Sequence, residues 1–206
     1  MYKKLTMACM AVAALAAFGI APAASASPVL TNAGVAVPVG TSILGTSTET
    51  PAFTGAFNVT CSKAVLTGTV TKNSGTNIEG TVPVGGAVYV GTGTGGDCTS
   101  GLGSTKVTVN SELCLASSAS DTLSITGCEG KSVVFTLEIT GTGPCKYSTA
   151  AVAGTFTTNT SPATVKVTEQ EAKKFEGGFF CPASGKLDQD FDLYKNTVEE
   201  PGLTIS

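Results

Sequence analysis

The sequence contains no tryptophan, no histidine and no arginine, and only 6% of its residues are aromatic. The lack of histidine excludes Ser-His-Asp and Cys-His catalysis and most catalytic zinc sites. No serine stands three positions before a lysine, and Gly-x-Ser-x-Gly does not occur, so two further nucleophile motifs are missing. We therefore expect that the protein is not an enzyme.

The charge balance argues against polyanionic partners. Without residues 1–26 the chain carries ten lysines and fifteen carboxylates, a net charge of −5. A surface that binds nucleic acid is normally basic, and arginine is its usual contact with phosphates and base edges. We expect no nucleic-acid partner and no binding to anionic membranes.

The amino terminus has the three parts of a secretory signal peptide. Lys3 and Lys4 are followed by an apolar run over residues 7–20, and residues 24–26 read Ala-Ser-Ala, the pattern of a cleavage site. The run is short for the roughly 20 apolar residues of a membrane span. We predict that residues 1–26 are removed. Residues 27–206 then form a single secreted domain without a transmembrane segment, located outside the cell and either released or associated with a surface.

Cysteine usage predicts how this domain is held together. Cys9 lies in the signal peptide, which leaves six cysteines: Cys61, Cys98, Cys114, Cys128, Cys145 and Cys181. An even number in an exported chain indicates three disulfides, although six cysteines allow 15 connectivities. The spacing favours the pairs Cys61–Cys98, Cys114–Cys128 and Cys145–Cys181. Zinc is the alternative, but there is no Cys-x-x-Cys pair and no histidine to complete a site.

Strand patterns recur along the whole chain. Three of them follow a cysteine, over residues 66–71, 152–157 and 187–192. In the first, alternation places Leu66, Gly68 and Val70 on an inner face, with threonines outside. Residues 132–140 form the clearest core strand. Many short strands with frequent turn signals predict an all-β fold, either an antiparallel β-sandwich or a Greek-key barrel, stapled by disulfides.

One short helix is expected at most. Thr168 and Glu171 fit a capping box, and Gly177 is a suitable C-terminal stop. A pair between Glu169 and Lys173 would support the same helix.

An acidic row is the sharpest candidate for a binding site. Asp188, Asp190 and Asp192 have the spacing of the first three ligands of a calcium loop. However, Leu193 occupies the sixth position, where such a loop needs glycine. The alternative is a strand that exposes the three aspartates and buries its other face. Calcium is therefore the one cofactor that the sequence leaves open. The sequence suggests no catalytic residue.

Several short motifs together resemble a protein family. They are Thr-Cys-x5-Thr-Gly-Thr-Val at Cys61, Glu-Leu-Cys-Leu at Cys114, Gly-Pro-Cys-Lys-Tyr at Cys145, and Phe-Cys-Pro-Ala-Ser-Gly-Lys-Leu-Asp at Cys181. This order resembles small exported, cysteine-containing β proteins of uncharacterised function found in soil actinobacteria. The resemblance implies a secreted β domain and assigns no catalytic residues.

These observations favour a non-enzymatic, secreted or cell-surface protein with a structural, adhesive or envelope-associated role. Its exposed strand faces would contact a cell-envelope polymer, a surface protein or other copies of the chain. A carbohydrate- or calcium-binding module is the first alternative, and a hydrolase that uses two carboxylates is the second.

Overall fold

The computed structural model describes residues 28–55, 57–74, 77–119, 121–196 and 202–206; the predicted signal peptide lies outside them. Within these ranges the chain forms strands and two 3-10 helices, and none of its helices is long and apolar enough to cross a membrane. The strands are β1 (Leu30–Asn32), β2 (Val35–Ala36), β3 (Ser42–Ser47), β4 (Ala52–Gly55), β5 (Val59–Thr60), β6 (Lys63–Ser74), β7 (Asn77–Val82), β8 (Ala87–Val90), β9 (Cys98–Ser100), β10 (Gly103–Val109), β11 (Leu113–Ala119), β12 (Thr122–Gly127), β13 (Val133–Ile139), β14 (Gly143–Thr149), β15 (Val152–Phe156), β16 (Thr164–Glu176), β17 (Ser184–Lys195) and β18 (Thr204–Ile205). The 3-10 helices are η1 (Thr94–Gly96) and η2 (Cys128–Gly130). The predicted all-β, antiparallel class is confirmed.

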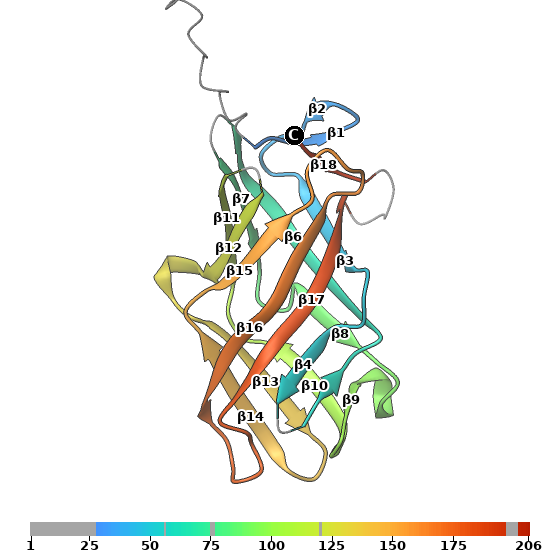
Figure 1. The fold of residues 1–206 in the computed structure, drawn as a ribbon, viewed down its shortest axis with the longest axis vertical. Helices are drawn as coiled ribbons and strands as arrows, with labels where there is room; N and C mark the ends of the chain where they lie inside the picture. Colours follow the sequence, from blue (N-terminus) through green and yellow to red (C-terminus); the bar gives the residue numbers. More distant parts are fainter. Residues whose placement is uncertain (1–27, 56, 75–76, 120, 197–201) are drawn as a thin grey trace, which may run out of the picture.

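Most strands belong to two closed rings that share one hairpin. The lower ring in Figure 1 runs β13–β14–β16–β17–β4–β5–β9–β10 and returns to β13. The upper ring runs β16–β15–β12–β11–β7–β6–β3–β17 and returns to β16. Strands β16 and β17 are long enough to serve both rings, with opposite ends in each. Closure leaves few unpaired strand edges, which protects a β protein from edge-to-edge aggregation.

Two further elements complete the arrangement. Strand β8 pairs with β6 of the upper ring and β10 of the lower ring, and so links the two. A separate sheet in the order β18–β1–β2 lies at the upper end, next to the carboxyl terminus (Figure 1). Leu30, Leu203 and Ile205 from this end pack with Val70 of β6 in a second hydrophobic cluster. The small sheet therefore covers the upper ring.

The helix predicted over residues 168–177 is wrong, because these residues belong to β16. Val167 pairs with Gln189 and Gln170 with Leu187, so Thr168 and Glu169 together oppose one residue of β17. Such a β-bulge shifts the alternation of buried and exposed positions and hides the period of two. Glu169 takes the left-handed conformation at φ 49°, and it pairs with Lys186 at 3.1 Å rather than with Lys173.

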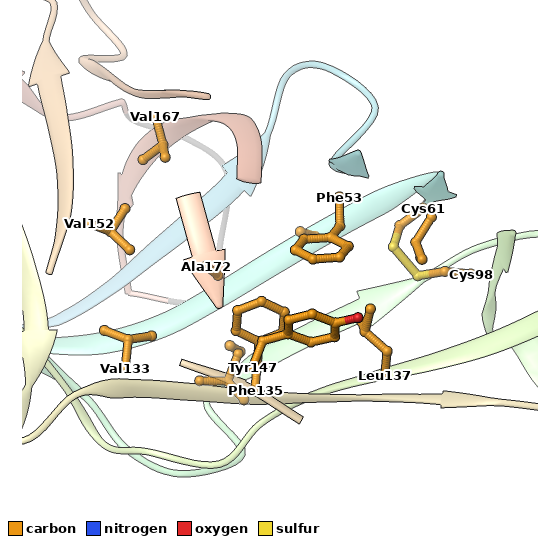
Figure 2. Packing of buried hydrophobic residues seen from close by; sticks show 14 of the residues in the cluster. Phe53, Cys61, Cys98, Val133, Phe135, Leu137, Tyr147, Val152, Val167 and Ala172 are labelled. Carbon is orange, nitrogen blue, oxygen red and sulfur yellow. A yellow bond between two sulfur atoms is a disulfide. The ribbon is translucent and has the colours of Figure 1, made fainter. Parts of the chain in front are cut away.

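The core of the lower ring is built on three aromatic rings. Phe53 of β4 contacts Phe135 of β13 and Tyr147 of β14, with ring centroids 5.5 and 4.9 Å away (Figure 2). The ring of Phe53 also covers Gly185, where any Cβ would overlap it. Tyr147 is fully buried, and its hydroxyl donates a hydrogen bond to the Pro182 carbonyl at 3.1 Å. Three aromatic side chains from three different strands thus pack together at the centre of the lower ring.

The three disulfides join Cys61 to Cys98, Cys114 to Cys128 and Cys145 to Cys181, as the spacing predicted. Figure 2 shows the first beside the aromatic core. Each closes 14 to 37 residues of sequence, and a disulfide of this kind stabilises a domain by about 2–4 kcal/mol. All six of these cysteines are in disulfides, so none of them is left to bind zinc.

Candidate functional site

The predicted acidic row lies on β17, but its three aspartates differ in environment. Asp188 is exposed, whereas Asp190 is only 7% exposed, which corrects the expectation that all three face solvent. Asp190 pairs with Lys166 on the neighbouring strand at 3.2 Å, and this contact raises the pKa of Lys166, mainly through the hydrogen bond. The Oδ1 atom of Asp192 accepts a hydrogen bond from the Thr164 hydroxyl at 2.7 Å.

Strand geometry separates these carboxylates. Alternate residues on one strand are about 6.6 Å apart, and calcium binds each oxygen at about 2.3–2.6 Å. In the described part of the chain, no three Asp, Glu, His or Cys side chains are grouped closely enough to hold a metal ion. Calcium binding at Asp188, Asp190 and Asp192 stays a prediction, and two of the three carboxylates already have protein partners.

A polar depression of about 360 Å³ lies on the lower ring beside Pro144. It contains Asp97, Lys106 and Glu138, and Lys106 is directly opposite Glu138 on the paired strands β10 and β13. Asp97 and Glu138 are thus two carboxylates that line one depression, as the hydrolase alternative requires. Glu138 is exposed and Asp97 is half-buried, whereas a general acid usually sits in an apolar pocket.

The strand predicted over residues 66–71, which follows Cys61, has most of the expected alternation. Val70 is buried and Leu66 packs against the main core, while Thr69 and Thr71 are exposed and Thr67 is half-buried. A Cβ on Gly68 would lie 2.7 Å from the Thr81 carbonyl oxygen, so glycine is needed where β6 and β7 approach closely.

The feature that sequence reasoning missed is a group of exposed phenylalanines, here called the phenylalanine tip: Phe175, Phe179 and Phe180. They lie at the end of the β16–β17 hairpin and are 56%, 97% and 65% exposed. The rings of Phe179 and Phe180 meet edge to face, with centroids 5.9 Å apart. The sequence did contain a signal, because three of nine phenylalanines fall within six residues that include Gly177-Gly178.

Several contacts fix the base of the phenylalanine tip. The disulfide Cys145–Cys181 ties the residue after Phe180 to β14. Lys174 Nζ donates to the Cys181 carbonyl at 2.9 Å, and Lys146 Nζ binds both oxygens of Glu176 at 2.8 and 2.9 Å. The tip is therefore presented from an ordered frame.

The polar side chains around the tip carry both signs of charge. On the two strands of the hairpin the exposed side chains include Glu171, Lys173, Glu176 and Lys186. Lys186 and Glu169 are 3.1 Å apart and form an ion pair across the hairpin. The tip is thus an apolar centre within a rim of mixed charge.

No family model matches the chain, and neither a curated protein nor a solved structure matches it.

Proposed function

We propose that the protein is secreted, non-enzymatic and adhesive, and that it attaches to a partner protein outside the cell through the phenylalanine tip. Three disulfides are compatible with an extracellular location, because such bonds persist in oxidising compartments. The predicted signal peptide agrees with this location.

The observation that carries the proposal is the exposure of Phe179, at 97%, beside Phe180, at 65%. Full burial of a phenylalanine side chain is favourable by about 1.5–3 kcal/mol. The exposed side chains of Phe179 and Phe180 do not obtain this free energy in the isolated protein. Only 6% of the residues of this chain are aromatic, yet three of its nine phenylalanines lie within the six residues of this tip. Contact with a partner would recover the free energy that burial offers.

The rigid base supports binding by this tip rather than collapse of its side chains. The disulfide and the Lys174 hydrogen bond hold the backbone on both sides of the loop. A loop ordered before binding loses less conformational entropy in the complex, so more of the contact energy appears as affinity.

The mixed charge of the rim favours a protein as the partner. Protein interfaces combine an aromatic centre with a polar rim, and aromatic residues dominate their binding energy. An anionic membrane would instead require an excess of basic residues. Next to the tip, Lys146 and Glu176 compensate each other's charge, and Lys186 and Glu169 do the same farther along the hairpin.

The experiment is binding of the labelled mature chain to intact cells of the producing strain. We expect saturable binding that is lost when surface proteins are first digested with a protease. A variant with Phe179→Ala and Phe180→Ala should lose this binding. Binding that survives digestion would contradict a protein partner and would favour the cell-envelope polymer. Concentration-dependent dimers in light scattering, with no binding to cells, would favour self-association.

A further inference from the structure

The interior of the upper ring contains a partly open apolar cavity of about 100 Å³. Each of its eight strands contributes to the lining, and the largest side chains include Ile43, Leu115, Phe156 and Leu193. Leu30 and Ile205 of the small covering sheet also line it, so the cavity reaches up to that sheet. Eight-stranded closed sheets are normally filled by their own side chains or hold one small ligand.

Three glycines help to create this space: Gly45, Gly68 and Gly80. Gly68 is required by the backbone, because a Cβ there would lie 2.7 Å from the Thr81 carbonyl oxygen. At Gly80 a Cβ would make a tight contact of 3.1 Å with the Thr69 carbonyl oxygen. Gly45 is different. A Cβ there would meet its nearest neighbour, the Leu66 Cβ, at 3.4 Å, which is ordinary contact. The chain therefore leaves empty a volume that a methyl group could occupy without strain.

The chemistry of the lining defines what could enter. Of the ionisable side chains, Glu79 alone is near the described wall, and its carboxylate is paired with Lys72 at 3.2 Å on the half-exposed outer surface. Thr69 is exposed on the same outer side. A polar ligand would lose its hydrogen bonds to water without finding replacements, and a cavity lined by hydrocarbon stays dry.

We propose that this cavity is a binding site for a small, neutral hydrocarbon or an equally apolar compound. An apolar cavity of about 150 Å³ accommodates benzene, so one of about 100 Å³ would take a slightly smaller molecule. A second apolar space of about 80 Å³ adjoins it and shares Leu66, Ile125 and Phe191 as lining residues. This site is independent of the phenylalanine tip.

The test uses cyclopentane as the probe and cyclopentanol as its polar counterpart. At ten times its Kd, cyclopentane should raise the melting temperature of the mature chain by about 3–5 °C. Cyclopentanol should give no rise, because its hydroxyl has no partner in the cavity. Carbon-13 methyl spectra should show changes at Leu115 and Ile125, which line the cavity, and none at the exposed Val88.

A matched pair of variants locates the site. Leu115→Phe fills the cavity, whereas Ala116→Phe places the same ring on the exposed face of the same strand. We expect the first variant to abolish the cyclopentane effect and the second to retain it. Gly45→Ala is the milder filling variant if Leu115→Phe does not fold, and its added methyl should weaken binding by about tenfold or more. No temperature rise in the wild type, or equal rises in all variants, would overturn the proposal.

Discussion

The side chain of Asn73 on β6 forms two reciprocal hydrogen bonds with the backbone of Leu30 on β1. Its Oδ1 atom accepts from the Leu30 N–H at 2.8 Å, and its Nδ2 atom donates to the Leu30 carbonyl at 2.7 Å. The same amide donates to the Val37 carbonyl at 2.9 Å. One side chain thus fastens the small sheet to the upper ring, above the apolar cavity.

Asn73→Ala should destabilise the fold by about 2–3 kcal/mol, because it leaves partly buried backbone groups of Leu30 and Val37 without partners. Urea unfolding of the mature chain measures this loss. Asn77→Ala is the matched control, since its amide has only a long contact of 3.5 Å to Glu79, and it should change stability by less than about 0.5 kcal/mol. Equal stability of the two variants would contradict the fastening role of Asn73.

Tyr147 should make the protein less stable at high pH. Burial raises the pKa of its phenol to about 12, whereas an unfolded tyrosine ionises near pH 10. The unfolded state therefore loses this proton first, and stability falls as the pH rises from 10 towards 12. The contribution lost by pH 11 is about 1.4 kcal/mol. Tyr147→Phe should remove this part of the decline, as urea unfolding at pH 9, 10 and 11 would show. Parallel profiles for the two proteins would contradict it.

Calcium should have little effect on the fold. Asp190 is already paired with Lys166, and the carboxylates of Asp188 and Asp192 are separated along the strand by about 13 Å. We expect the melting temperature to change by less than about 1 °C in millimolar calcium. A larger, saturable rise that disappears in Asp188→Asn would establish the calcium interpretation instead.

Local patterns were sufficient to predict much of this fold. Val133, Phe135, Leu137 and Ile139 alternate along the sequence, and all four are buried in β13. The disulfide pairs could be predicted because each joins cysteines that are neighbours in sequence. Closure of the rings could not, because pairs such as β4 with β17 join residues more than a hundred positions apart, and no local pattern encodes them.

At the candidate sites, predictions from sequence patterns were wrong or incomplete for physical reasons. The bulge at Thr168 and Glu169 broke the alternation of β16, so a strand resembled a short helix. Asp190 was expected on the surface, but Lys166 on the adjacent strand compensates its charge and allows its burial. Phe179 and Phe180 belong to a residue type that usually indicates core, and only the hairpin geometry reveals that they point into solvent.

The affinity of the mature chain for intact producer cells tests the proposed adhesive role most directly. We expect the variant with Phe179→Ala and Phe180→Ala to bind at least about 30-fold more weakly, which corresponds to about 2 kcal/mol lost at the centre of an interface. The matched control replaces two other exposed apolar residues, Val35→Ala and Val84→Ala, and should keep its Kd within about twofold. Equal Kd values for the wild type and the phenylalanine variant would contradict attachment through the tip.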